Sequence, residues 1–325
     1  MQARAMLLNR RGLLAGAGSA AILAGCAAPF PDDRAEELYP PIGELIPAGD
    51  EIVHVWRASP EGAGAERTPV VLIHGASGNL RDFTFALAPF LAAERPVIAV
   101  DRPGFGYSTR PATGAEDPRE QARIIRSATE GLGIERPIVL GHSYGAAVAM
   151  GWAVTAPETL SGVVAVSGVT MPYRGAGRFL SAIGLTSLIT WAYTEYLKSI
   201  ADEGGVESFL SRVFRPQRVP DGYAEYVGAP LSLRDGTLRA NGKDLERVNS
   251  VLIEMSPEYG KLDLPVEIVH GEADFIDAAK QGVALDAVLQ RSRLTLLPKV
   301  GHMAHHVAPA VLAAACSRIE GTLES

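Results

Sequence analysis

Cysteine is nearly absent from this 325-residue chain, which contains only Cys26 and Cys316. Two cysteines cannot build the disulfide framework of a small secreted scaffold. A clustered excess of positive charge is also missing, because the formal net charge is -7 and no run of Lys and Arg lies beyond the N-terminus. Phosphate contacts require clustered cations, so we expect no nucleic-acid partner. Heptads and repeats of solenoid length are absent as well.

The remaining composition is that of an ordinary globular protein, with 47% hydrophobic and 21% charged residues. Such a chain is long enough to bury a large core. Its length is compatible with two domains of typical size or with a single α/β domain.

The first 25 residues differ from the rest of the chain. "MQARAMLLNRR" carries three Arg and no acid, and "GLLAGAGSAAILAG" then supplies fourteen small or apolar residues. A charged segment before a short apolar one is typical of an export signal, and it is too short for a mature membrane span. A buried N-terminal helix is the alternative. The pair Arg10-Arg11 fits either a twin-arginine signal or an ordinary charged region.

The apolar segment ends in "LAGC", Leu23 to Cys26, which resembles the bacterial lipobox. The resemblance implies that residues 1–25 are a signal peptide and that Cys26 carries acyl chains. The protein would then be exported and held to a membrane on the periplasmic side of the cell envelope. Residues 26–48, rich in proline and acid, are predicted to be a tether. Cys316 is predicted to be a buried packing residue of a helix.

Apolar runs alternate with helical patterns in residues 49–170 and again in 260–325. Continuous apolar runs of this length are typical of strands covered on both faces. Such strands are predicted at 69–74, 96–101, 137–142, 160–168, 264–270 and 293–298, after an early strand near 51–59. Intervening helices favour an α/β fold whose parallel sheet has helices on both faces.

Residues 171–259 interrupt this alternation with helical patterns and no buried strand. We therefore predict a helical cap over the carboxyl edge of the sheet. Its apolar stretch contains Ser, Thr and Glu, which favours a pocket lining over a membrane span.

Ser143 lies in the pattern G-x-S-x-G, within "GHSYG", between a predicted strand and a predicted helix. This is the context of a nucleophile elbow, a sharp turn that lifts a serine hydroxyl above the sheet. Gly141 and Gly145 suit it because the turn is crowded. A serine hydroxyl needs a base, and the chain order serine, acid, histidine places that base further along.

His302 follows the last predicted strand, in "GHMAHH", and is predicted to be the general base. His305 and His306 lie close by and are interpreted as surface or packing residues. His142, inside the elbow, and His74, at a strand end, are expected to pack or to form hydrogen bonds. Zinc ligands at the usual spacing do not accompany these histidines, so we expect no metal.

Asp274 is the predicted acid that orients His302, since it lies four residues past a strand end. Glu272 and Asp277, in the same loop "GEADFID", are the alternatives. The predicted oxyanion hole consists of the backbone N–H groups of Ala76 and Tyr144.

Ser77, beside Ala76 in "HGASGN", could approach a substrate or cap the following helix. Further along the chain, Arg174, Arg178 and Arg212 could anchor a polar substrate in the cap or could be surface charges.

The motifs "HGASGN", "DRPGFGYS", "GHSYG", "HGEAD" and "GHMAHH" resemble the α/β-hydrolase superfamily in order and spacing, from about Ile52 to the C-terminus. The resemblance implies a mostly parallel sheet, with the cap inserted after the strand that follows the nucleophile helix. It also implies a structural role for Asp101. Gly104 and Gly106 do not complete a dinucleotide motif, and we expect no cofactor.

A serine at the elbow, where epoxide hydrolases and haloalkane dehalogenases of this superfamily carry aspartate, favours acyl-transfer chemistry. We therefore predict a serine hydrolase acting on a carboxylic ester or related small acyl compound. Carbon–carbon bond hydrolases and cofactor-free perhydrolases use the same triad and remain alternatives. A silent binding protein would be expected to have lost part of the triad. The oligomeric state is left open.

Overall fold

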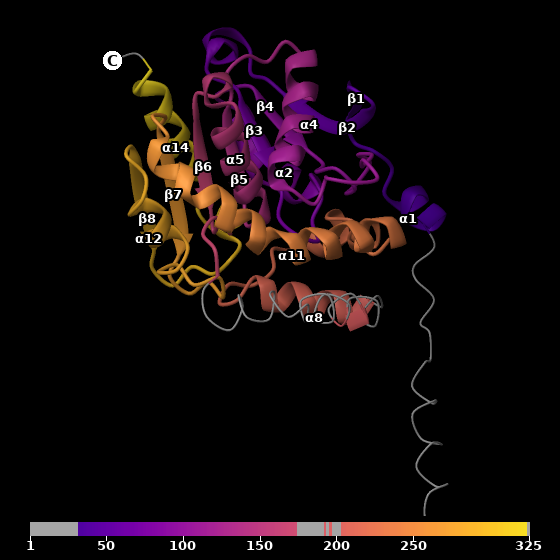
Figure 1. Cartoon of the computed structure of the whole chain (residues 1–325). Coiled ribbons are helices and arrows are strands. Elements are labelled where there is room, and N and C mark those ends of the chain that lie inside the picture. The colour runs from indigo at the N-terminus through magenta and orange to yellow at the C-terminus, as the bar shows by residue number, and fades with distance from the viewer. Residues whose placement is uncertain (1–31, 174–191, 193–194, 197–202, 324–325) are drawn as a thin grey trace, which may run out of the picture.

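The computed structural model describes residues 32–173, 192, 195–196 and 203–323, and its fold centres on one eight-stranded sheet (Figure 1). The strand order is β1-β2-β4-β3-β5-β6-β7-β8. The bounds are β1 (Glu44–Ala48), β2 (Glu51–Ala58), β3 (Val70–Ile73), β4 (Val97–Val100), β5 (Ile138–His142), β6 (Gly162–Val166), β7 (Val266–Gly271) and β8 (Ser292–Leu297). Every neighbouring pair from β4 to β8 in this order is parallel. Strand β2 is antiparallel to both of its neighbours, β1 and β4. The predicted mostly parallel sheet is confirmed.

Helices cover both faces of this sheet. They are α2 (Arg81–Thr84), α3 (Leu87–Ala92), α4 (Pro118–Gly131), α5 (Tyr144–Thr155), α12 (Gly282–Asp286), α13 (Ala304–Val307) and α14 (Pro309–Gly321). Helix α1 (Asp32–Leu38) instead contacts the segment inserted after β6. The side chains of β3, β4, β5 and β6 are buried throughout, as expected for strands between two layers of helices.

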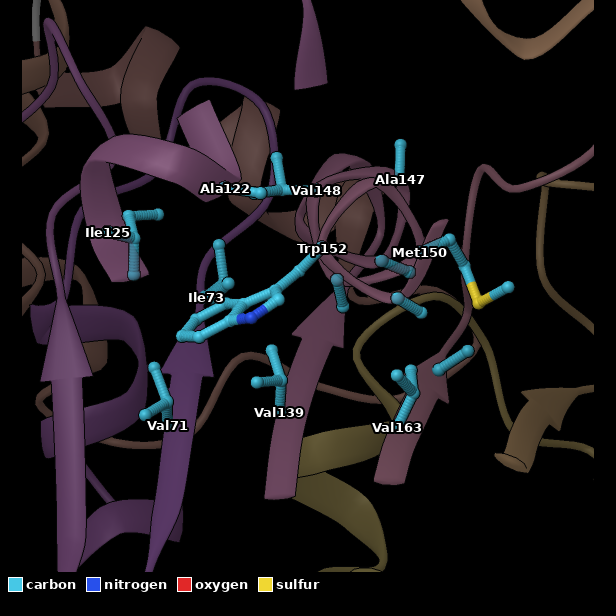
Figure 2. Close-up of a cluster of buried hydrophobic side chains, with 14 of the residues drawn as sticks. Val71, Ile73, Ala122, Ile125, Val139, Ala147, Val148, Met150, Trp152 and Val163 are labelled. Carbon is cyan, nitrogen blue, oxygen red and sulfur yellow. The ribbon is translucent and has the colours of Figure 1, made fainter. Parts of the chain in front are cut away.

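Figure 2 shows how one of these layers packs. Trp152 of α5 lies over Ile73, Val71 and Val139 of the central strands and is 1% exposed. Its indole N–H donates a hydrogen bond to Thr159 Oγ1 at 2.8 Å, so the polar atom of this buried ring is satisfied. The packing fixes α5, and with it the turn that precedes this helix.

The predicted tether needs correction for residues 32–48. This segment forms α1 and β1, and β1 pairs with β2 from Glu44 opposite Val55 to Ala48 opposite Glu51. Ala35 and Ala48 are buried, and Glu44 pairs with Arg57 at 2.7 Å. Proline and acid made the segment resemble a linker, but main-chain pairing to β2 places it in the fold. Cys26 and the predicted signal peptide lie outside the described residues.

The inserted segment after β6 is helical wherever the structure describes it as regular. It contains α8 (Glu203–Val213), α9 (Tyr223–Tyr226), α10 (Ala229–Ser232) and α11 (Asp235–Met255). Figure 1 shows α11 running across one end of the sheet, with α8 on its far side. Within the described residues, no helix is both long and apolar enough to cross a membrane.

Cys316 is fully buried in α14, as its sequence context predicted. Burial raises the pKa of its thiol to about 12. Since the thiolate is the reactive form, we expect a Cys26→Ser chain to show no thiol reaction with a disulfide reagent at pH 8 while folded. One thiol per chain should react in denaturant. Rapid reaction of the native chain would contradict the buried placement.

Candidate functional site

The turn between β5 and α5 has the geometry of a nucleophile elbow. Ser143 adopts φ 53° and ψ -116°, a region that residues with a Cβ rarely occupy. Two backbone hydrogen bonds hold it there: its N–H donates to Val166 O at 2.9 Å, and its carbonyl accepts from Val169 N–H at 3.0 Å. Strand β6 and the segment that follows it therefore maintain the strained conformation.

The two glycines of the motif are required by close backbone contacts. A Cβ on Gly141 would collide with the carbonyl of Gly145, and a Cβ on Gly145 would collide with the carbonyl of Ile73. Since these obstacles are backbone atoms, they cannot rotate away. The G-x-S-x-G pattern thus reflects how tightly β3, β5 and α5 approach one another.

His302 and Asp274 are in contact, as the sequence predicted. His302 Nδ1 lies 2.9 Å and 3.0 Å from the two carboxylate oxygens of Asp274. Ile276 N–H also donates to Asp274 at 2.8 Å, and His270 Nε2 lies 3.3 Å from it. Burial alone would raise the pKa of Asp274, but hydrogen bonds with His270 and His302 hold this pKa far below its usual range. A carboxylate that is charged at neutral pH therefore faces the imidazole.

The two alternative acids do not share this position. Glu272 and Asp277 are exposed, and Asp277 pairs with Lys280 at 2.7 Å. The structure thus distinguishes Asp274 from its neighbours by contact with His302. His270, at the end of β7, is a supporting residue that the sequence pattern did not single out.

His74 and His142 are buried and hydrogen-bonded, in keeping with their predicted packing roles. His74 accepts a hydrogen bond from Arg102 N–H at 3.0 Å, and burial followed by the charge of Arg102 lowers its pKa to about 4. His142 Nε2 lies 3.1 Å from the carbonyl of His302. Burial, with the nearby rings of His305 and His302, lowers the pKa of His142.

A cavity of about 520 Å³ brings the predicted site residues together. Ser143 and His302 line it, and Ala76 and Tyr144 belong to the same wall. Tyr144 is the first residue of α5, where a backbone N–H has no partner within the helix. The proposed oxyanion donors therefore border the same space as the serine.

Most of the cavity wall is apolar. Its lining includes Val206, Phe209, Leu210, Val213, Leu233 and Val248, all from the cap helices or the loop between them. No Lys or Arg is found among the lining residues that the structure describes. Arg212 is exposed and bonds to Tyr196 OH at 2.7 Å, whereas Arg174 and Arg178 lie outside the described residues.

Ser77 and Arg102 connect the site to the cap in a way that the motifs did not reveal. Ser77 N–H donates to Asn241 Oδ1 of α11 at 2.8 Å. Arg102 is fully buried, bonds to Asp244 of α11 at 2.6 Å and lies over the ring of Tyr144 at 4.4 Å. Helix α11 of the cap is therefore hydrogen-bonded to the loops that follow β3 and β4.

Asp101 occupies the structural position that its motif implied. Its carboxylate lies 2.6 Å from His54 Nδ1 and accepts N–H groups of Leu80 at 2.7 Å and Tyr107 at 2.9 Å. These bonds join strand β2 to the segments that carry Leu80 and Tyr107. Asp101 is not among the cavity's lining residues.

Comparison with known proteins agrees with this architecture. A family model described as alpha/beta hydrolase fold matches residues 68–309. The dihydrolipoyllysine-residue acetyltransferase component of an acetoin cleaving system from Pseudomonas putida is 30% identical over 146 residues, 45% of this chain and 38% of that protein. The 2-hydroxy-6-oxo-6-phenylhexa-2,4-dienoate hydrolase of Burkholderia cepacia is 23% identical over 72% of this chain and 81% of its own length. The structure of a membrane phospholipase A, a bacterial virulence factor, superposes with a TM-score of 0.65 at 18% identity and covers 90% of both chains.

Proposed function

We propose that this chain, which belongs to the alpha/beta hydrolase fold family, cleaves carboxylic esters with an apolar acyl group. The observation that carries the proposal is the shared cavity of Ser143 and His302, whose described walls are apolar. The contact between His302 and Asp274 supports it, because a charged acid stabilises the imidazolium that forms during acyl transfer.

The proposed reaction has two halves. His302 takes the proton of Ser143 Oγ as Oγ bonds to the ester carbonyl carbon, and the N–H groups of Ala76 and Tyr144 stabilise the oxyanion. The carbon–oxygen bond to the alcohol then breaks, and His302 protonates the departing alcohol. Water, deprotonated by His302, attacks the acyl-enzyme; the bond between the acyl carbon and Oγ breaks, His302 returns the proton to Ser143 Oγ, and the acid leaves.

The apolar cavity predicts a preference for longer acyl groups. Each methylene buried in an apolar site contributes about 0.8 kcal/mol, so kcat/KM for p-nitrophenyl esters should rise about two- to fourfold per methylene until the cavity is filled. The measurement is a series from acetate to dodecanoate with the full chain in detergent. A flat profile would contradict an acyl-binding role for this cavity.

Carbon–carbon bond cleavage is the second candidate, because a relative named 2-hydroxy-6-oxo-6-phenylhexa-2,4-dienoate hydrolase matches most of the chain. A dienoate carries a carboxylate, which calls for a cation or several N–H donors. The described cavity lining supplies no Lys or Arg, which favours the ester. Cleavage of that dienoate by this protein, without ester turnover, would reverse the choice.

We also propose that the protein is exported and lipidated at Cys26 in the bacterial cell envelope. The support is the sequence "LAGC" after a charged and an apolar segment. Labelling of expressing bacteria with a radioactive fatty acid should mark the wild-type chain and not a Cys26→Ser chain. Equal labelling, or none, would contradict lipidation at Cys26.

A further inference from the structure

A buried carboxylate on the wall of the cavity joins three elements of the fold. Asp82 of α2 is 5% exposed. It accepts a hydrogen bond from Tyr223 OH at 2.8 Å, and His305 Nε2 and His306 Nε2 lie 3.0 Å and 2.8 Å from its oxygens. We call these four residues the Asp82 junction. The predicted packing roles of His305 and His306 do not account for two imidazoles directed at one carboxylate.

The junction connects the cap with the segment that carries the general base. Tyr223 begins cap helix α9, and both histidines belong to α13, which begins two residues after His302. The ring of His305 lies 4.2 Å from the ring of His142, and His142 Nε2 in turn lies 3.1 Å from the carbonyl of His302. A displacement of Asp82 would therefore reach both the cap and the backbone of His302.

The negative charge of Asp82 strengthens its hydrogen bonds to the cap and to α13. Burial alone would raise its pKa, but the contacts with His305 and His306 hold this pKa well below its usual range. Within the described residues, the Nδ1 atoms of both histidines have no hydrogen-bond partner, and each Nε2 faces a carboxylate oxygen of Asp82, which in its charged form can only accept. Three donors thus depend on one carboxylate, and removing it would leave all three buried without an acceptor.

We propose that Asp82 is a positioning residue that couples the seating of cap helix α9 to the placement of the segment carrying His302. The inference rests on the proposed serine hydrolase function, because its effect is read through Ser143. It assigns two separable consequences to the junction. The bond with Tyr223 governs how the cap encloses the acyl group, and the bonds with the histidines govern the reactivity of Ser143.

Two measurements on the full chain in detergent separate these consequences. The first is the second-order rate of Ser143 phosphonylation by ethyl p-nitrophenyl methylphosphonate, a small probe that tests the serine–histidine chemistry: Oγ bonds to phosphorus and p-nitrophenolate leaves. The second is KM for p-nitrophenyl octanoate. We expect Asp82→Asn to lower the phosphonylation rate about tenfold and to raise KM about threefold, because charged hydrogen bonds are lost. Tyr223→Phe should raise KM similarly and leave phosphonylation within about twofold.

Thr84→Val is the matched control. It removes a different hydrogen bond between α2 and the cap, the one between Thr84 Oγ1 and Tyr226 OH at 3.0 Å, and leaves the bonds of both histidines to Asp82 in place. It should leave the phosphonylation rate within about twofold of wild type.

Should Asp82→Asn fail to fold, His306→Phe is the second variant. It removes one donor to Asp82 while a ring remains against Tyr223 and Phe214. A phosphonylation rate about threefold lower is expected for it.

The proposal would be overturned if a folded Asp82→Asn chain reacted with the probe at the wild-type rate. If Asp82→Asn does not fold, a wild-type rate in His306→Phe would overturn it. Neither result would affect the proposed hydrolase function. An equal loss of phosphonylation rate in Thr84→Val would also overturn the positioning role of Asp82, because general docking of the cap would then explain the effect.

Polar atoms of Asp82, His142 and His305 lie within 4.8 Å of one another. Stoichiometric zinc in the wild-type protein, lost from Asp82→Asn, would therefore overturn the positioning role in favour of metal ligation. A wild-type chain that neither turns over esters nor reacts with the probe would instead overturn the proposed function itself.

Discussion

Ser143→Ala is expected to lower kcat for p-nitrophenyl esters by about 10⁴- to 10⁶-fold, the range seen when a triad nucleophile is removed. In the proposed reaction Ser143 Oγ forms the bond to the acyl group, and of the three serines in the described cavity lining only Ser143 lies in the turn between β5 and α5. Residual rate over water would come from the oxyanion donors and from binding. The assay is the same ester series, read by release of p-nitrophenol.

The fold should survive this substitution. Alanine keeps the Cβ of Ser143, and the backbone bonds to Val166 and Val169 do not involve the hydroxyl. Ser167→Ala is a matched control, since Ser167 also follows a buried strand, has φ 45° and is fully buried, yet does not line the cavity. It should keep its turnover. Near-normal turnover in Ser143→Ala would contradict the proposed nucleophile.

The sheet and the common cavity of Ser143 and His302 could be predicted because both leave local signals in the sequence. A strand buried on both faces must be apolar throughout, as "VVLI" and "VIAV" are, and such runs mark β3 and β4 directly. The elbow is equally local, since the two glycines are needed by contacts within and beside the motif. Chain order then selected His302.

The supporting residues could not be predicted because their partners are distant in the sequence. Asp82 lies 141 positions from Tyr223, and Arg102 lies 142 positions from Asp244. Nothing in "NLRDF" distinguishes Asp82 from a surface acid of an amphipathic helix; only burial beneath the cap does so. The same reason explains β1, whose place depends on pairing with β2 and not on its own composition.

Asp274→Asn is expected to lower kcat about 10⁴-fold, as in triads where this exchange stabilises the wrong imidazole tautomer. An amide nitrogen facing His302 Nδ1 would be a donor facing a donor, so the ring would favour the form that cannot accept the proton of Ser143. Ile276 N–H and His270 would also face a neutral amide in place of the carboxylate. Steady-state kinetics on p-nitrophenyl esters measure the loss.

The controls for this substitution are Glu272→Gln and Asp277→Asn, the two other acids of the loop. Both are exposed, so turnover should stay within about twofold of wild type. A larger loss in either control than in Asp274→Asn would contradict the assignment of the acid.

The depressed pKa of Asp274 also gives this substitution a pH signature. A carboxyl group whose pKa is lower in the folded state contributes stability above its unfolded pKa, and loses it as the pH falls toward the folded value. The difference in Tm between wild type and Asp274→Asn should therefore be largest near neutral pH. It should shrink below about pH 4, where the unfolded carboxyl group is protonated. A difference that grows toward acid would mean that Asp274 is not held as a charged partner of His302.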